Sequence, residues 1–181
     1  MIFRLDVTLS DDDYFAFNNF HSFESVQGKK LIKKSRIFFI LAMLFLATLF
    51  VLMIGFTTFS LIYTLLLFLF TTFYMALFKK ILARNIKVQI KRLKKTGKLP
   101  FEPVSSLEFY EDKIVEITEA KRTEQAYTVL EKICVAKERY VFLYTSSVGA
   151  YILPMAQLDK QLDQEAFLDF LMQKCSVVEE Y

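Results

Sequence analysis

Residues that build reactive centres are scarce in this chain. It has a single histidine, His21, and two cysteines, Cys134 and Cys175, among 181 residues. Structural zinc sites are usually formed by four Cys or His ligands, so these three residues supply no usual zinc set. The serines near Gly149 lack the G-x-S-x-G pattern, and the one histidine lies far upstream, which gives a hydrolase triad no support. We expect packing or surface roles for His21 and for both thiols.

Glycine is equally rare, and no two of the four glycines lie close together. Loops that cradle a phosphate or a dinucleotide need clustered glycines. The sequence has no such loop, and we expect no cofactor. Each glycine is instead predicted at the boundary of an element, with a left-handed helix C-cap favoured at the third of them: Gly28, Gly55, Gly97 and Gly149.

Acidic residues are missing from a long middle block. Residues 1–28 have a net charge of −4, residues 29–98 carry fourteen Lys and Arg and no acid, and residues 99–181 have a net charge of −7. Such sorting indicates a membrane or polyanion partner for the middle block. We divide the chain accordingly into a cytosolic strand and helix (1–28), a transmembrane hairpin with basic flanks (29–98) and a cytosolic β domain (99–181).

The forty-two residues 37–78 carry no charge at all. As one helix they would span roughly 60 Å, whereas one crossing of the hydrocarbon core needs about 30 Å. Two crossings fit, and the break is predicted in the GFTTFS segment (55–60). We therefore expect spans at 37–54 and 61–78. A cleaved signal peptide is disfavoured because the run begins late, is too long and lacks a small-residue cleavage site.

Lys and Arg flank both outer ends of this hairpin, and the turn between the spans has none. Lys and Arg next to a span stay on the cytoplasmic side, so we predict a two-span membrane protein with both termini in the cytoplasm. Two thiols that need not pair suit that reducing compartment. The flanking cations are the candidate residues for topology or for binding anionic lipid headgroups: Lys29, Lys30, Lys33, Lys34, Arg36, Lys79, Lys80, Arg84, Lys87, Lys91, Arg92, Lys94 and Lys95.

The second basic flank, Lys79–Lys95, has an internal helical pattern. Its apolar residues Leu82, Ile86, Ile90 and Leu93 share one helix face, and most of its cations lie off that face. We favour topology and attraction to anionic lipid for this segment, with docking of the acidic parts of the chain as the alternative. Nucleic-acid binding is disfavoured because the segment lacks interleaved aromatic residues or a recognised module.

The segments before and after the hairpin show the residue patterns of short strands and helices. Residues 3–9 alternate apolar and polar and predict a half-buried strand. Ser10 and Asp13 then have the spacing of a capping box before a helix at 11–23. After Pro103 we expect five to seven short antiparallel strands, with strand alternation through EQAYTVLEKICVA (124–136), and then a helix with Phe167, Leu171 and Cys175 on one face. The predicted fold class is α+β: a two-helix transmembrane hairpin and a small antiparallel β domain capped by a C-terminal helix. This order of strands and helix resembles the pleckstrin-homology-like (PH-like) architecture.

Four stretches together resemble the YcxB-like family of bacterial membrane proteins: FRLDVTLSDDDYFAFNNFHS, the hairpin with its basic flanks, LEFYEDKIVEITE and AYILPMAQLDKQLDQEAFLDFLMQK. The resemblance extends over nearly the whole chain. It implies two spans, a C-terminal cytosolic domain and no assigned activity, so there are no catalytic residues to carry over.

The function expected from these patterns is a membrane-anchored interaction module that binds a protein partner or anionic lipid. No catalytic motif is found, and we expect no enzyme. Two alternatives remain: a membrane-bound enzyme that uses carboxylates of the C-terminal domain, and a small oligomeric channel. Thr64, Thr71 and Thr72, near one face of the second span, hint at an association surface. The acids of the first strands are expected on a solvated face: Glu108, Glu111, Asp112, Glu116 and Glu119.

Overall fold

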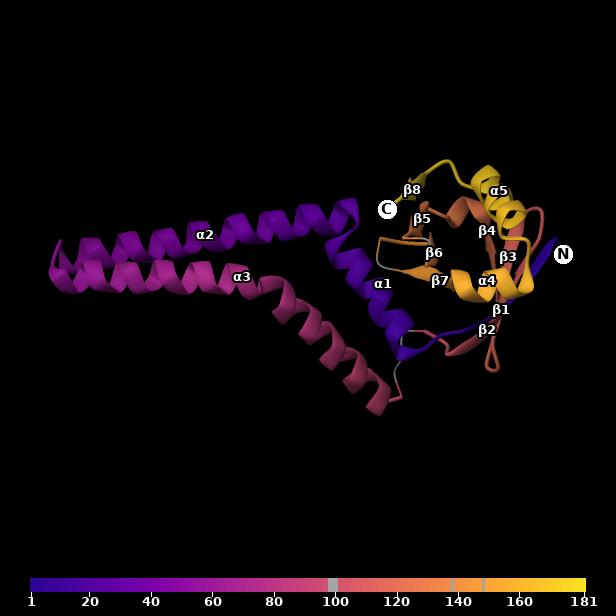
Figure 1. Cartoon of the computed structure of the whole chain (residues 1–181), viewed down its shortest axis with the longest axis horizontal. Coiled ribbons are helices and arrows are strands. Elements are labelled where there is room, and N and C mark those ends of the chain that lie inside the picture. Colours follow the sequence, from indigo (N-terminus) through magenta and orange to yellow (C-terminus); the bar gives the residue numbers. More distant parts are fainter. Residues whose placement is uncertain (98–100, 138, 148) are drawn as a thin grey trace. The chain divides into compact units, whose positions relative to one another are not determined.

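The computed structural model describes residues 1–97, 101–137, 139–147 and 149–181. They form two compact units, a β-rich unit of residues 1–20 and 90–181 and a helical unit of residues 21–89 (Figure 1). Two long apolar helices and two largely antiparallel sheets make this an α+β protein, as the sequence predicts.

The first sheet contains the N-terminal strand together with three strands from beyond the hairpin. Its order is β1 (Phe3–Thr8), β2 (Val104–Phe109), β3 (Lys113–Ile117) and β4 (Arg122–Ala126), and all neighbours are antiparallel. β1 pairs with β2 over its whole length. An isolated strand is not stable in water, and this pairing confirms that the N-terminal strand packs on the C-terminal part of the chain.

The second sheet is built from β5 (Lys132–Ala136), β6 (Tyr140–Tyr144) and β7 (Ala150–Pro154), which are antiparallel. A short strand, β8 (Val178–Glu180), is parallel to β5. Two helices, α4 (Met155–Gln161) and α5 (Gln164–Lys174), lie between β7 and β8 in the chain.

The strand alternation predicted through residues 124–136 is confirmed at both ends, by β4 and β5, and is wrong in between. Residues 127–129 form a 3₁₀ turn, η1 (Tyr127–Val129), that separates β4 from β5. The ring of Tyr127 is buried, and its hydroxyl donates a hydrogen bond of 3.0 Å to the carbonyl of Tyr110. The buried ring and this hydrogen bond hold the turn between β4 and β5.

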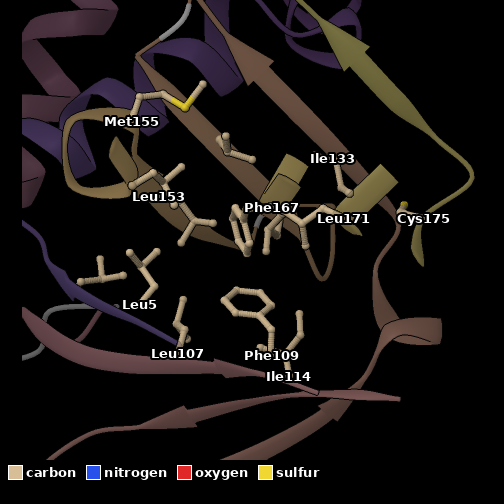
Figure 2. Packing of buried hydrophobic residues seen from close by; sticks show 14 of the residues in the cluster. Leu5, Leu107, Phe109, Ile114, Ile133, Leu153, Met155, Phe167, Leu171 and Cys175 are labelled. Atoms are coloured by element: carbon tan, nitrogen blue, oxygen red, sulfur yellow. The ribbon is translucent and has the colours of Figure 1, made fainter. Parts of the chain in front are cut away.

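The main core lies between the two sheets and α5 (Figure 2). Alternate residues of β1, β2 and β3 point inward, among them Leu5, Leu107 and Ile114. Phe167 of α5 meets Phe109 of β2 edge to face, with ring centroids 4.9 Å apart. The helix predicted from Phe167, Leu171 and Cys175 is confirmed, and all three side chains are buried.

The other face of the second sheet is covered by α1 (Asp11–Phe23). Phe17 and Phe20 of this helix pack on Phe142 of β6, with ring centroids 5.3 and 5.0 Å apart. The predicted cap is present: Ser10 accepts a hydrogen bond from the amide of Asp13, and the carboxylate of Asp13 accepts one from the amide of Ser10. Both faces of the second sheet are therefore shielded.

The helical unit is a hairpin of α2 (Val26–Ile54) and the greater part of α3 (Thr58–Lys95), which run side by side (Figure 1). The predicted spans lie inside these helices, and the break falls at residues 55–57. Gly55 has a φ of 81° and ends α2, while Thr57 and Ser60 accept hydrogen bonds from each other's amides at the start of α3. The turn thus satisfies its own backbone groups without a charged residue.

Aromatic rings join the two helices, with Phe39 stacked on Tyr74 and Phe50 on Tyr63 at centroid distances of 4.6 and 3.9 Å. Most of the remaining large side chains in the hairpin point outward, as Phe38 and Leu52 do at 75% exposure each. Both helices are long and apolar enough to cross a membrane, and neither apolar window is buried within the protein.

Candidate functional site

The predicted lipid-facing cations occupy two stretches of helix beside the apolar windows. Five of them, from Lys29 to Arg36, lie in the N-terminal third of α2, and the other eight, from Lys79 to Lys95, lie in the C-terminal half of α3. Arg36 is partly buried, and the other twelve are exposed. The two stretches therefore place their charge at the open end of the hairpin, away from the uncharged turn.

The two-sided character predicted for the end of α3 is present. Leu82, Ile86 and Leu93 are partly buried and Ile90 is buried, whereas the cations of the same segment are exposed. At the end of this segment, Lys94 forms an ion pair of 2.8 Å with Asp11 of α1, within the β-rich unit. Lys94 therefore contacts the acidic N-terminal segment, as the docking alternative anticipates.

Arg36 is the cation nearest to the uncharged run. Its guanidinium carbon lies 5.6 Å from the centroid of the Phe78 ring on α3. Its Nε is buried and has no hydrogen-bond partner among the described residues. A guanidinium over an aromatic face is stabilised by the ring quadrupole, so this pair ties the first residues of one span to the last residues of the other.

A groove of about 360 Å³ lies between the two helices of the hairpin. Thr64, Thr71 and Thr72 line it together with apolar residues such as Met43 and Met75. All three threonine hydroxyls donate to carbonyls of their own helix, four residues earlier, at 2.8–3.0 Å. The sequence correctly places the three threonines on one surface, but their hydroxyls are already occupied within α3.

A larger pocket, of about 500 Å³, lies within the β-rich unit between the two sheets and α1. Its apolar lining residues include Val7, Leu9, Phe17, Phe101, Leu107 and Ile152. Its polar lining residues are Glu102, Ser105, Glu116, Lys121, Gln125, Thr145 and Tyr151, and two of them, Ser105 and Glu116, lie directly across from Val7 and Leu107 in the first sheet. A concave site with an apolar wall and a few converging polar groups is the usual form of a small-molecule site.

The strand register accounts for the polar side of this pocket. Side chains alternate along a strand, so Glu116 of β3 faces the same way as the core residue Ile114. Gln125 of β4 is the direct cross-strand partner of Ile114 and shares that face. Ser105 of β2 lies on the inner face with Leu107. The inner face of the first sheet is therefore apolar along β1 and places polar side chains beside apolar ones on β2, β3 and β4.

The polar groups in the pocket interact with one another. The hydroxyl of Tyr151 donates to Oε1 of Gln125 at 3.1 Å, and the carboxylate of Glu116 lies 3.8 Å from Nζ of Lys121. Burial raises the pKa of Tyr151 to about 12, and the negative charge of Glu116 adds to the effect. Tyr151 consequently remains a neutral hydroxyl near pH 7.

A second group of buried polar side chains links β5 to β8. Lys132, which is 8% exposed, donates to the carboxylate of Glu179 at 2.7 Å, and the hydroxyl of Tyr181 donates to the same oxygen at 2.8 Å. The thiol of Cys134 lies 3.5 Å from that oxygen. Burial raises the pKa of Cys134 to about 12. This cluster stabilises the parallel strand pair and does not produce a reactive thiolate.

The expectation of a solvated face is wrong for two of the five acids. Glu108 is only 9% exposed, and the side chain of Glu116 is 17% exposed. Glu108 accepts a hydrogen bond from the hydroxyl of Tyr110 at 3.0 Å and lies beside Arg4, whereas Glu116 points into the pocket. Within the described part of the chain, no three His, Cys, Asp or Glu side chains converge as a metal site.

The pocket was not predicted from the sequence, because Glu116 was assigned to a solvated face together with the other acids of EDKIVEITE. The signal that could have revealed it is the alternation from Ile114, which assigns Glu116 to the buried face of β3. The partner groups Gln125 and Tyr151 come from other strands, and only the strand pairing brings them together.

Comparison with families of known proteins matches residues 109–171 to the YcxB-like proteins. The matched segment begins at the last residue of β2, ends within α5 and contains Glu116, Gln125 and Tyr151. Comparisons with curated proteins and with solved structures found no match. The resemblance predicted from the sequence motifs is thereby confirmed for residues 109–171, which match the YcxB-like family.

Proposed function

We propose that this chain is a membrane-anchored interaction protein. In this proposal α2 and α3 cross the bilayer as a hairpin, and both termini lie in the cytoplasm. The β-rich unit is a PH-like module displayed on that side, where it binds a protein partner, while the basic stretches contact anionic lipid. The two largely antiparallel sheets and the helix packed on them support the PH-like description.

The pairing of β1 with β2 is the observation that carries the proposal. β1 precedes the hairpin, β2 follows it, and the two strands are hydrogen-bonded from Phe3–Phe109 to Thr8–Val104. Strands of one sheet must lie in one compartment. A chain that crosses a membrane between these two strands must cross it an even number of times, and two apolar helices meet that requirement.

The distribution of charge supports the cytoplasmic side. All Lys and Arg of residues 29–98 lie outside the uncharged run 37–78, and none lies in the turn at residues 55–57. Lys and Arg next to a span are retained in the cytoplasm. Each exposed cation near an anionic surface adds roughly 1 kcal/mol of attraction, so the same residues favour contact with anionic headgroups.

A binding role fits the buried side chains better than a catalytic one. The thiols of Cys134 and Cys175 are buried, and the raised pKa of Cys134 disfavours a nucleophilic thiolate. The proposal accordingly assigns the chain no reaction, and its role rests on what the displayed module binds.

Cysteine labelling in intact bacterial cells tests the topology. Phe56, 89% exposed, lies in the turn of the hairpin, and Glu119 lies in the exposed turn before β4. We expect a membrane-impermeant maleimide to label Phe56→Cys in intact cells and Glu119→Cys only after permeabilisation. The unsubstituted chain is the control, because its two cysteines are buried. Labelling of Glu119→Cys in intact cells would overturn the proposal.

A further inference from the structure

We propose that the pocket between the two sheets binds a small amphipathic amine, with the apolar body of the ligand on the aromatic and aliphatic wall and its ammonium group held by Glu116. This inference concerns a ligand site inside the β-rich unit and does not depend on the membrane topology. The pocket has a volume of about 500 Å³, which lies within the range of roughly 300–1,000 Å³ typical of small-molecule sites.

Glu116 is the charged pocket residue that lies on a strand, whereas Glu102 and Lys121, which also line the pocket, lie outside the strands. It is the cross-strand partner of Leu107 on one side and of Thr123 on the other, so its position is fixed in the middle of the first sheet. Its side chain is 17% exposed. A largely buried carboxylate is costly unless a cation or hydrogen-bond donors accompany it, and this requirement favours a ligand that brings a positive charge.

The cation now beside Glu116 is loosely held. Lys121 comes from the turn before β4, its side chain is 55% exposed, and its Nζ is 3.8 Å from the carboxylate. A charge-assisted hydrogen bond between an ammonium and a carboxylate is usually about 2.7–2.9 Å long. A ligand ammonium can therefore replace Lys121 at a shorter distance, and the lysine can swing into solvent on its flexible stem.

The other polar groups suit the same ligand. Gln125 offers an amide oxygen, and Tyr151 offers a neutral hydroxyl that already donates to Gln125. Neither carries a negative charge that would have to be neutralised, and neither carries a positive charge that would repel an amine. The apolar wall, which includes Phe17, Phe101 and Ile152, accounts for the hydrophobic part of the ligand.

Three probes that differ only in the head group test this assignment: 4-phenylbutylamine, 4-phenylbutanol and 4-phenylbutyrate. Binding is measured by isothermal titration to the full chain in nanodiscs of zwitterionic phosphatidylcholine, with empty nanodiscs as the background. We expect the amine to bind at least about tenfold more tightly than the alcohol, which corresponds to one strong charge-assisted contact. The carboxylate should bind most weakly, because it faces Glu116.

Paired variants connect the preference to the pocket. Glu116→Gln should remove the preference for the amine and leave the binding of the alcohol within about twofold. Glu124→Gln is the matched control, because it makes the same substitution on the outer face of the same sheet, where Glu124 pairs with Lys113 at 2.6 Å. Lys121→Met should tighten amine binding, since it removes the competing cation, and Ala150→Phe should abolish binding of all three probes by filling the pocket.

Thermal unfolding of every variant is followed by circular dichroism, so that a misfolded variant is recognised. Lys121→Met alters an exposed side chain and keeps the test decisive even where Glu116→Gln fails to fold. An amine preference that survives Glu116→Gln, or an alcohol and a carboxylate that bind as well as the amine, would overturn the head-group assignment. Binding to the full chain that does not exceed that to empty nanodiscs would overturn the site itself.

Discussion

Gln157 and Thr8 lie 149 positions apart in the chain and exchange two hydrogen bonds. The amide of Thr8 donates to Oε1 of Gln157 at 2.9 Å, and Nε2 of Gln157 donates to the carbonyl of Thr8 at 2.7 Å. Gln161 makes the same pair of bonds with Asp6. Residues four apart on a helix are spaced about 6 Å, which is close to two residues of strand. The two glutamines of α4 therefore take the place of a neighbouring strand along the edge of β1.

This edge explains a first prediction. Gln157→Glu together with Gln161→Glu keeps an acceptor for each strand amide but places a second oxygen against each strand carbonyl. Two hydrogen bonds are lost, and a bond of this type contributes about 0.5–1.5 kcal/mol, so we expect the free energy of unfolding to fall by roughly 1–3 kcal/mol. Urea unfolding in nanodiscs measures the change. Gln173→Glu on the exposed face of α5 is the control. If the double variant were as stable as the parent protein, the role of α4 at the edge of β1 would be contradicted.

Gly28 gives a second prediction through its position in the first turn of α2. A Cβ at this residue would lie 2.2 Å from the carbonyl oxygen of His21 and 2.5 Å from that of Ser22. Both contacts are with backbone, so Gly28→Ala has to force the end of α1 away from α2. We expect a loss of roughly 1–3 kcal/mol, typical of overpacking, and faster proteolysis near residues 21–28. Gln27→Ala, at an exposed neighbour in the same turn, should have no such effect.

The elements with strong local signals could be predicted from the sequence. The capping pair Ser10 and Asp13 set the start of α1, Gly55 ended α2, and Gly97 has the left-handed φ of 66° favoured for a helix C-cap. α4 and β8 were missed. β8 has only three residues and is stable through its pairing with β5, and such a tertiary contact leaves little trace in the local pattern.

The site was harder to predict than the fold, because its parts come from distant segments. Glu116, Gln125 and Tyr151 belong to three strands, and only the antiparallel register aligns the first two. The same holds for Gly28. The sequence predicts it at the boundary of an element, but what requires glycine there is the close approach of the His21 carbonyl, which leaves no room for a Cβ. The residue pattern within one helix or strand predicts which of its faces is buried. Which residues of other elements that face contacts depends on the tertiary structure.

A third prediction concerns Cys134. The thiol is fully buried and its pKa is raised to about 12, chiefly by desolvation. At pH 8 only about one thiol in ten thousand is then ionised. We expect the Cys175→Ala variant, in which Cys134 is the only cysteine, to react with a thiol reagent at least about a hundredfold more slowly when folded than in 6 M guanidinium. Rapid reaction of the folded protein at pH 8 would show that the β5–β8 region opens readily.

A fourth prediction follows from Glu179. Burial alone would raise its pKa, but the hydrogen bonds from Lys132 and Tyr181 and the charge of Lys132 outweigh burial and hold the pKa below its ordinary value of 4.5. Since the folded pKa is the lower one, the stabilisation is complete above the unfolded pKa and is lost as the pH falls through the folded pKa. Glu179→Gln should therefore be less stable than the parent at pH 7, and the difference should shrink below about pH 4.5.

The measurement for Glu179 is urea unfolding at a series of pH values between 7 and 3. Glu180→Gln is the matched control, because that side chain is exposed on the same strand. A stability difference between the parent and Glu179→Gln that stays constant over the whole series would mean that the Lys132–Glu179 pair does not titrate with folding.

The fifth prediction concerns the threonine surface of the hairpin. The hydroxyls of Thr64, Thr71 and Thr72 donate to carbonyls of α3 itself, so they are not needed as donors to a second helix. Replacing all three by valine keeps the shape of the groove and removes only these internal bonds. We expect the mass of the protein in nanodiscs, measured by light scattering, and its crosslinking pattern to stay the same. By contrast, Thr71→Phe fills the groove and should alter any association that uses it. A change of oligomeric state in the triple valine variant would show that the hydroxyls bind a partner helix, and it would favour the oligomeric alternative over a single membrane anchor.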